Sequence, residues 1–420
     1  MFDYGVEEEL LKGTPGQNIK HWPTEGELTA LVDADTIPYI VGFTSTVQEY
    51  LKFKNSPDPY KSDVWLDKID HANYILNTWV EQAGCDSAIL FLTNSEDNFR
   101  LEIGTVKEYK GQRREEKPPF FSELKTWIET EHKAVMSRRC EADDEISIEA
   151  WNRHRAWAKE NKAANLWKPE HKASCNFVII SKDKDLKIIP GMHLPPDMER
   201  PVKLWVKPIG WLEPKYQKSE VKAYENWPLF DGKPVNLKHL IAFISSDGVM
   251  GAVSSDKLKK NTPGWEESHI WYLLDDKAKP VKQDTFTRGT NRGKGKFKRV
   301  QVGTTKKQNI QKLTGAGLLF FYSQLITGDG VDNYPGLPGH GPVKAYEALA
   351  GLRRERDLCM KVAKMYISHY GDPGIARLAM LEQARLAHMQ THPGELWEFP
   401  SDQRGTFPSW AWGPNDYEDE

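Results

Sequence analysis

Three short apolar segments, separated by stretches with helical spacing, constrain the fold of this chain more than any other feature. They are residues 29–35 (TALVDAD), 88–93 (AILFLT) and 177–181 (FVIIS). Each contains an unbroken apolar run rather than an alternating pattern, which is typical of strands buried on both faces of a parallel sheet. We therefore predict an α/β protein whose mostly parallel central sheet is flanked by helices.

The spacing of apolar residues also predicts the helices that cover such a sheet. The expected helices are 67–83, 122–134, 143–161, 317–326, 342–350, 355–370 and 374–388. Gly84 is placed to end the first of them. Between 213 and 312 the helical and strand periodicities weaken, and prolines, tryptophans and basic residues become frequent.

The length of 420 residues is large for one compact domain, so we expect an α/β body with an insertion. The expected parts are an N-terminal extension (1–28), an α/β core (29–212), an insertion or elaborated lobe (213–312), a C-terminal helical region (313–395) and a tail (396–420). No internal repeat is visible in the sequence.

The charges of the chain are segregated, although its formal net charge is only −3. Residues 288–307 carry eight Lys or Arg and no carboxylate, whereas acids cluster elsewhere, as in residues 141–145. A protein that holds both phosphates and metal ions needs such a separation. The four cysteines form no C-x-x-C pair, which indicates a reducing compartment: the cytoplasm, or the host cytoplasm for a viral chain. The sequence has no apolar run long enough to predict a membrane span.

Acidic side chains follow the predicted strands or begin the predicted helices. They are Asp33, Asp35, Glu141, Asp143, Asp144, Asp183, Asp185, Asp329 and Asp332. Each alone has a structural explanation as a turn former or a first-turn helix residue. Several carboxylates at one sheet edge repel one another unless cations bind or protons are taken up. Oxygen ligands without Cys or His favour Mg²⁺ or Mn²⁺, and two such ions about 4 Å apart suit hydrolysis of a phosphodiester bond.

Six motifs in a fixed order give the chain a resemblance to a known family. They are LVDAD (31–35), FLTNSEDNFR (91–100), EYKGQR (108–113), CEADDEIS (140–147), ISKDKDLKIIPG (180–191) and LITGDGVDNYPGLPGHGPVKAYEAL (325–349). With them the chain resembles the 5′-nuclease superfamily of flap endonucleases and 5′→3′ exonucleases, most closely the exonucleases of short-tailed phages. The resemblance covers about 29–200 and 314–390, and it implies a PIN-like core with a helical arch at about 105–140.

The resemblance implies roles for the matching residues. Asp33, Glu141, Asp143 and Asp144 would hold one metal ion, with Asp35 nearby. Asp183, Asp185, Asp329 and Asp332 would hold the second. The implied catalytic residues are Asp33, Asp143, Asp144, Lys110 and Arg113, of which the two cations would steer the scissile phosphate. Asn94 stands where the family often has an aspartate, so it would ligate through its amide oxygen unless Glu96 or Asp97 substitutes.

The Gly-rich turn before the helix at 342–350 matches the helix–three-turn–helix element of that family. Gly336, Gly339 and Gly341, with Lys344, would bind one duplex strand and a K⁺ ion, although a plain helix–helix connection is the alternative. The other implied DNA contacts are Lys107, Tyr109, Lys110, Arg113, Arg114, Arg292, Lys294, Lys296, Lys298 and Arg299. A solvated loop explains the two basic segments nearly as well.

The resemblance implies a metal-dependent 5′→3′ exonuclease with flap-endonuclease character. Its substrates would be DNA with free 5′ ends, flaps or gaps, and RNA primers in RNA–DNA hybrids, alongside replication proteins as partners. The alternatives are a structure-specific DNA-binding protein that has lost cleavage, because of Asn94, and a PIN-type ribonuclease. Residues 239–251 (HLIAFISSDGVMG) weakly match a LAGLIDADG homing-endonuclease motif, and an apolar helix with a Gly turn explains them as well.

Overall fold

The structure of the chain is a computed structural model. It describes residues 19–94, 98–112, 116–162, 169–196, 201–224, 241–244, 250–253, 272–273, 282–285, 295–297 and 301–400. The chain divides into two compact units, one of Met1–Lys215 with Ile310–Glu420 and one of Tyr216–Asn309.

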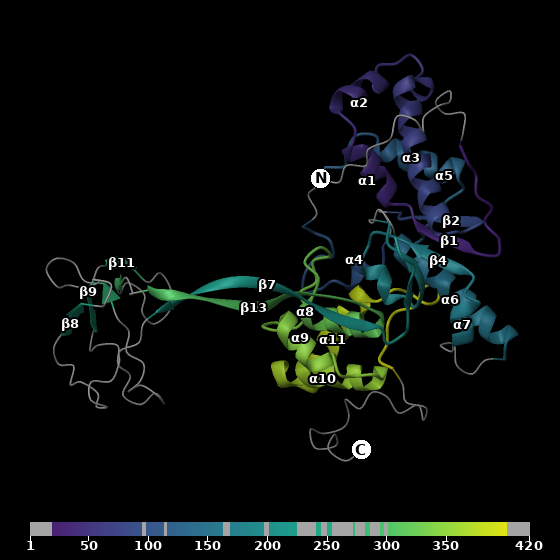
Figure 1. The fold of residues 1–420 in the computed structure, drawn as a ribbon. Helices are drawn as coiled ribbons and strands as arrows, with labels where there is room; N and C mark the ends of the chain where they lie inside the picture. Colours follow the sequence, from purple (N-terminus) through teal and green to yellow (C-terminus); the bar gives the residue numbers. More distant parts are fainter. Residues whose placement is uncertain are drawn as a thin grey trace. The chain divides into compact units, whose positions relative to one another are not determined.

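The larger unit is built on a six-stranded sheet with the strand order β3-β2-β1-β4-β5-β6 (Figure 1). The strands are β1 (Thr29–Asp33), β2 (Ser87–Leu92), β3 (Val135–Met136), β4 (Phe177–Ile180), β5 (Gly191–Leu194) and β6 (Leu204–Val206). All neighbouring pairs are parallel except β5 and β6. The predicted mostly parallel sheet is therefore confirmed, and the three apolar segments are its central strands.

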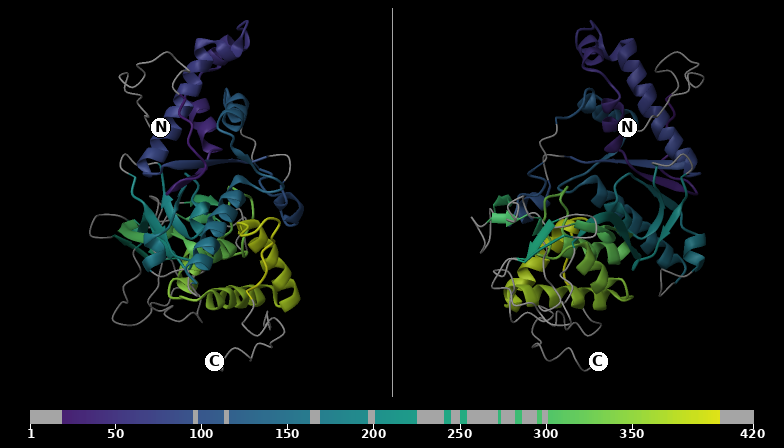
Figure 2. Two further views of the ribbon diagram at one scale, coloured as in Figure 1. Left: turned by 90° about the vertical axis from the view of Figure 1, so that its right-hand side faces the viewer. Right: turned by 60° about the vertical axis from the view of Figure 1, so that its left-hand side comes forward.

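Helices cover both faces of this sheet (Figures 1 and 2). One face packs against α1 (Thr36–Phe43), α3 (Asp63–Gln82) and α5 (Phe121–Glu131), and the other against α6 (Ala142–Glu160). Alternate residues of β1 point to opposite faces of the sheet. Ala30 and Val32 lie in the core on the α1, α3 and α5 face, and Leu31 lies in the core on the α6 face. Burial on both faces explains why the strands are continuously apolar.

The boundaries of the predicted helices are set by local capping. The expected helix at 67–83 begins four residues earlier, because the side chain of Ser62 accepts a hydrogen bond from the Trp65 backbone N–H. Gly84 follows its end with a φ of +60°. Shorter helical segments are α2 (Val47–Lys54), η1 (Pro59–Lys61), α4 (Arg100–Ile103), α7 (Pro169–Ala173) and η2 (Asp185–Ile188).

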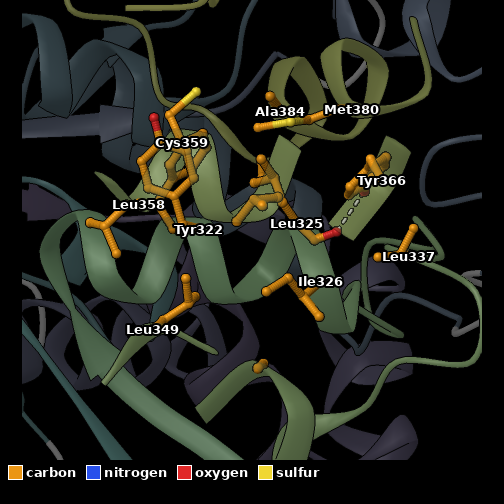
Figure 3. Packing of buried hydrophobic residues seen from close by; sticks show 14 of the residues in the cluster. Tyr322, Leu325, Ile326, Leu337, Leu349, Leu358, Cys359, Tyr366, Met380 and Ala384 are labelled. Atoms are coloured by element: carbon orange, nitrogen blue, oxygen red, sulfur yellow. Dashed lines mark hydrogen bonds between the residues drawn. The ribbon is translucent and has the colours of Figure 1, made fainter. Parts of the chain in front are cut away.

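The C-terminal helices form a third core in the same unit. They are α8 (Gly317–Thr327), α9 (Pro342–Leu349), α10 (Glu355–Tyr370) and α11 (Pro373–Ala387), close to the predicted ranges. Figure 3 shows Leu325, Leu349 and Leu358 packed together in this core, and the buried Tyr366 hydroxyl donates to the Leu325 carbonyl at 2.6 Å. This packing fixes the end of α8, from which the loop carrying Asp329 and Asp332 emerges.

That loop is closed by glycine conformations. Gly328 and Gly336 have φ values of +69° and +64°, and a Cβ on Gly336 would lie 2.2 Å from the Gly328 nitrogen. Asp329 and Tyr334 form an isolated antiparallel bridge inside the loop. Only glycine allows the two ends to approach this closely.

The segment expected to form a helical arch, at about 105–140, contains a loop followed by the predicted helix at 122–134, which is α5 (Phe121–Glu131). Its described residues 105–112 and 116–120 contain no helix, and α5 and β3 occupy the remainder. Pro118 and Pro119 lack the backbone donors that a longer helix before α5 would require.

The described residues of the smaller unit all lie in strands. Residues 239–251 include β8 (Ile241–Ile244) and β9, which begins at Met250 and pairs with β8 in antiparallel fashion, so the helical interpretation of this segment was wrong. Its isoleucines favour a strand over a helix. The other strands are β10 (Tyr272–Leu273), β11 (Lys282–Thr285) and β12 (Gly295–Phe297). The long strands β7 (Trp211–Tyr224) and β13 (Gln301–Ala316) form a two-stranded sheet.

The described helices include none that is both long and apolar enough to cross a membrane. All four cysteines are free thiols, as their spacing in the sequence predicted.

Candidate metal centre

The candidate site begins where β1 and β4 end side by side. Asp33 is the last residue of β1, and its carboxylate accepts a 2.7 Å hydrogen bond from the Ser181 hydroxyl, which follows β4. The backbone N–H of Asp183 donates to Ser181 Oγ at 2.8 Å, and that of Asp185 donates to the Asp183 carboxylate at 2.8 Å. Parallel pairing of the two strands thus brings three acids to one sheet edge.

A small cavity of about 30 Å³ lies at this edge, and we call it the acidic pocket. Its acidic lining residues come from three separate parts of the chain. They are Glu141 and Asp143 at the start of α6, Asp183 and Asp185 after β4, and Asp332 after α8. Arg100, Tyr109, Lys110, Gln324 and Tyr334 line it as well, with the apolar residues Leu386, Ala387 and Met389. With Lys110 and Lys184 bonded to the carboxylates, this volume suits a water molecule or one small cation.

Crowding and burial change the protonation of these acids. Burial, together with the charges of Asp35 and Asp183, raises the pKa of Asp33 to about 7. Burial and Asp183 likewise raise the pKa of Asp185 to about 7, although Lys184 opposes the shift. For Asp143, burial and then Asp183 and Asp33 raise the pKa well above its ordinary value. The carboxylates of the three strand and helix ends are therefore close enough to repel one another.

The loop carrying Lys110 is held against the pocket. Tyr109 is buried, and its hydroxyl donates to Glu141 Oε2 at 3.0 Å. Lys110 Nζ bonds to the Glu141 carboxylate and lies 3.8 Å from Asp332 Oδ1. The Lys110 backbone N–H donates to the Asp332 carbonyl at 3.0 Å. These contacts hold Lys110 at a φ of +55°, a conformation that costs a non-glycine residue about 1–2 kcal/mol.

A second lysine, Lys184, neutralises acids beside the pocket. Lys184 Nζ bonds to Asp329 and lies 3.8 Å from Asp185 Oδ1. Burial alone would raise the pKa of Asp329, but the hydrogen bond and charge of Lys184 lower it below its ordinary value. Asp329 also accepts from the Val331 backbone N–H at 2.7 Å, so it is engaged within its own loop.

Asp144 takes a different position from the one implied by the resemblance. Its fully buried carboxylate faces Arg100, with Oδ2 at 2.5 Å from Nη1 and Oδ1 at 2.8 Å from Nη2. The backbone N–H groups of Gln390 and Glu141 each donate to one of its oxygens at 3.0 Å. Four hydrogen bonds leave this carboxylate no lone pair directed at a metal ion. Asp144 therefore positions Arg100 and the start of α6.

Gln324 lines the acidic pocket and was not singled out from the sequence. Its Nε2 lies 2.5 Å from Asp185 Oδ1, and its Oε1 is buried without a hydrogen-bond partner among the described residues. A buried polar atom in this condition indicates a partner such as a water or an ion. The signal was present in the sequence, since Gln324 is an amide within the otherwise apolar segment FFYSQLI.

Asp35 and Asn94 do not line the acidic pocket. Asp35 accepts from the Thr93 backbone N–H at 2.9 Å and lies 3.3 Å from Lys125 Nζ. The backbone N–H of Asn94 donates to the Ser137 hydroxyl at 2.9 Å. Glu96, Asp97, Arg113 and Arg114 lie outside the described residues.

The donor chemistry of the pocket fits a hard divalent cation, but the side chains are not gathered around one. Within the described part of the chain, no three His, Cys, Asp or Glu side chains converge as metal ligands. Lys110 and Lys184 instead occupy carboxylate oxygens. The oxygen-only donor set, the raised pKa values and the unpartnered Gln324 Oε1 match what Mg²⁺ or Mn²⁺ would satisfy.

The predicted DNA contacts outside the pocket lie in several places. Gly339 has a φ of +73°, Gly341 precedes the first turn of α9, and Lys344 Nζ donates back to the Gly339 carbonyl at 3.2 Å. Lys107 is exposed. Arg292, Lys294, Lys298 and Arg299 lie outside the described residues, and Lys296 belongs to β12.

Comparisons with known proteins add a similarity of fold. No protein-family model matches the chain, and neither does any curated protein. Among solved structures, it is similar to the T5 D15 protein, in a crystal structure of that protein co-crystallised with metal ions. The two share 14% identity over 86% of this chain and 90% of that chain, with a TM-score of 0.36. At this TM-score the similarity assigns no role to any residue here.

The raised pKa values predict how stability depends on pH and on divalent cations. The folded protein keeps protons on Asp33 and Asp185 to about pH 7, whereas the unfolded chain loses them near pH 4, so these groups make stability fall as pH rises through this interval. Without divalent cations, Asp185→Asn should therefore raise the free energy of unfolding at about pH 8 by about 1–3 kcal/mol, and by less at about pH 5.

Urea denaturation in EDTA at both pH values measures this effect, and Glu25→Gln, which removes an exposed carboxylate, is the control. Mg²⁺ should stabilise the wild type most at the higher pH, because it binds the ionised carboxylates. An Asp185→Asn variant less stable than the wild type at about pH 8 would show that the pocket acids are not mutually repulsive.

Proposed function

We propose that this protein is a metal-dependent nuclease that hydrolyses phosphodiester bonds of DNA. The proposal is carried by five carboxylates, from the start of α6, the segment after β4 and the loop after α8, which line one small pocket together with Lys110. Such crowding is costly for stability alone, and strained, acid-rich pockets are a mark of functional sites.

Two divalent cations, Mg²⁺ or Mn²⁺, would be held by these carboxylates. Glu141, Asp143 and Asp33 are the ligands that we propose for one ion, and Asp183, Asp185 and Asp332 for the other, with Asp329 beside them. When bound, such ions supply an activated water and stabilise charge on the attacked and leaving oxygens. The pocket side chains of this chain orient one another through Ser181, Tyr109 and Gln324.

Lys110 would act on the phosphate itself. It is fixed between Glu141 and Asp332 by its backbone and its side chain, so its charge lies at the mouth of the acidic cluster. A positioned cation stabilises the additional negative charge that develops on a phosphate during hydrolysis. Binding of a cation to Glu141 would free the ammonium group for this contact. Arg113, three residues further along the chain, is proposed as its partner on the same phosphate.

The finer activity that we propose is a 5′→3′ exonuclease with flap-endonuclease character. The order of the six sequence motifs supports it, as does the α8–α9 pair with its closed glycine loop. Free backbone N–H groups at the start of α9 suit a phosphate of duplex DNA, and the turn carbonyls suit a K⁺ ion. DNA with 5′ ends, flaps or gaps is the proposed substrate, with RNA primers in hybrids, during replication or degradation of DNA.

A DNA-binding protein with weakened cleavage is the second candidate. Two residues expected as ligands favour it: Asn94 carries no charge, and the oxygens of Asp144 are saturated by Arg100 and backbone donors. This candidate predicts wild-type DNA binding with little hydrolysis in Mg²⁺ or Mn²⁺. End-labelled duplex, gapped and flapped substrates in the two metals separate the two functions and show which substrate is cleaved fastest.

Removing single pocket carboxylates should abolish cleavage without abolishing binding. Asp143→Asn and Asp185→Asn are each expected to lower the Mg²⁺-dependent rate by at least about 100-fold, because each removes a charge that holds a cation. Their affinity for DNA in EDTA should stay within about twofold of the wild type, since phosphate contacts are made by other residues. Glu25→Gln is the matched control. Either variant cutting at the wild-type rate would exclude the pocket as the site of hydrolysis.

Reversing the charge of the loop at 108–113 should affect both rate and binding. The double variant Lys110→Glu with Arg113→Glu is expected to cut at least about tenfold more slowly, and its salt dependence of binding should weaken because two phosphate contacts are lost. Single-turnover rates and anisotropy titrations over a range of salt measure the two effects. The control is the double variant Lys159→Glu with Lys162→Glu, which reverses two exposed charges elsewhere. If the two double variants cut at the same rate, Lys110 and Arg113 are not part of the site.

A further inference from the structure

Glu382, in the segment MLEQARLA of α11, holds the loop that leads from α4 to Lys110. Its Oε1 accepts hydrogen bonds from the backbone N–H groups of Thr105 at 3.1 Å and Val106 at 3.0 Å. The Thr105 hydroxyl donates to its other oxygen, Oε2. Both carboxylate oxygens are therefore bonded to one loop, and hydrogen bonds to a charged acceptor are stronger than those between neutral groups. We call this contact the Glu382 clamp.

The residues that follow the clamp form a tight turn that ends at Lys110. A Cβ on Gly104 would lie 2.7 Å from the Lys107 carbonyl oxygen and 3.2 Å from the Tyr109 nitrogen, so the chain folds back closely on itself here. A turn packed this closely passes a displacement at its start on to its end. The clamp fixes the start of the turn, and it thereby restricts where Lys110 can lie.

The other end of the same loop is held by the loop that carries Asp332. Asn333 Nδ2 donates to the Glu108 carbonyl at 2.9 Å, and the Lys110 N–H donates to the Asp332 carbonyl at 3.0 Å. Lys110 thus lies beside one anchor and follows a second, the Glu382 clamp. Its φ of +55° is a sparsely populated conformation, which persists only where surrounding contacts over-determine it. Loss of the clamp removes one of these contacts.

Consecutive residues of α11 hold the two loops that meet at Lys110. Gln383, which follows Glu382, is buried, and its Oε1 accepts from the Gly336 backbone N–H at 2.8 Å. Gly336 closes the loop that carries Asp332. Neighbouring side chains on a helix point about 100° apart, so one helix can hold two loops and fix the distance between them. In this way α11 ties the cation of the candidate site to its carboxylates.

We propose that Glu382 is a positioning residue, which acts through Lys110 by fixing the loop that presents this cation to the substrate phosphate. Glu382 is not among the residues that line the acidic pocket, so its effect on the reaction is indirect. The inference rests on the proposed function for the role of Lys110. It adds that the geometry of this loop is set from α11, nearly 280 residues later in the chain.

The first test is hydrogen–deuterium exchange of the full chain in EDTA, so that neither metal nor hydrolysis contributes. Glu382→Ala should make the amides of 105–106 exchange at least about threefold faster, because they lose their acceptor. The amides of 108–112 should also exchange faster, because the turn transmits the change. Glu129→Ala, which removes an exposed carboxylate on α5, is the control and should leave both segments unchanged.

The second test is a double-mutant cycle on single-turnover cleavage with Mg²⁺ at saturating DNA. Glu382→Ala should lower the rate about fivefold in the wild type but by less than about twofold in a Lys110→Ala background, since it then has no cation to position. Glu382→Gln keeps an oxygen that accepts from both backbone N–H groups, and it should lose less rate than Glu382→Ala.

Two results would overturn the inference. One is faster exchange confined to 105–106, with 108–112 as in the wild type. The other is an equal loss of rate from Glu382→Ala with and without Lys110, which would show that Glu382 acts by another route. A wild type that hydrolyses no DNA would instead refute the proposed function. The exchange measurement would then still decide whether Glu382 positions the loop of Lys110, so the two failures are distinguishable.

Discussion

The structure depends on one electrostatic constraint, the gathering of carboxylates from distant segments at one edge of the sheet. Asp33 ends a strand, Asp143 begins a helix and Asp185 follows another strand. The charge of Asp183 nevertheless raises the pKa of all three, and the charge of Asp33 also raises the pKa of Asp143. Like charges in a buried site destabilise the fold unless protons, lysines or metal ions compensate. Protons on the raised acids and the cations Lys110 and Lys184 compensate in the present arrangement.

A buried ion pair holds the frame around this pocket. Arg100 binds both oxygens of Asp144, and its remaining donors reach the carbonyls of Leu386 at 3.1 Å and His388 at 2.6 Å. It thereby ties the start of α6 to the end of α11 and the residues just after it, which supply the apolar wall of the pocket. Removing one partner of such a pair leaves an unpaired buried charge, which costs about 3–5 kcal/mol. The Arg100–Asp144 pair therefore holds in place the segments that carry the mutually repulsive carboxylates.

Much of this fold was predictable from the sequence because its signals are local. Unbroken apolar runs such as 88–93 are typical of strands buried on both faces, and the acids that end β1 or follow β4 lie at one sheet edge. The pairing of β7 with β13 was not predicted, because both strands are largely polar and are far apart in sequence.

The site was predictable in its location but not in the role of each side chain. Asp143 and Asp144 are consecutive on a helix, so their side chains point about 100° apart and only one of them can face the pocket. Asp143 lines the pocket and Asp144 binds Arg100, a choice that depends on the packing of α4 and the segment after α11. Gln324 could be placed on a helix from the sequence, but its contact with Asp185 is a tertiary one.

The most direct test of the metal centre is diffraction from crystals of this protein grown with Mn²⁺, with an anomalous difference map. We expect a peak in the acidic pocket within about 2–2.5 Å of oxygens from both Asp143 and Asp185, which belong to different segments. Lys110 should then have moved away from Glu141. A map without a peak in the pocket, at a Mn²⁺ concentration in which the same protein hydrolyses DNA, would contradict the account.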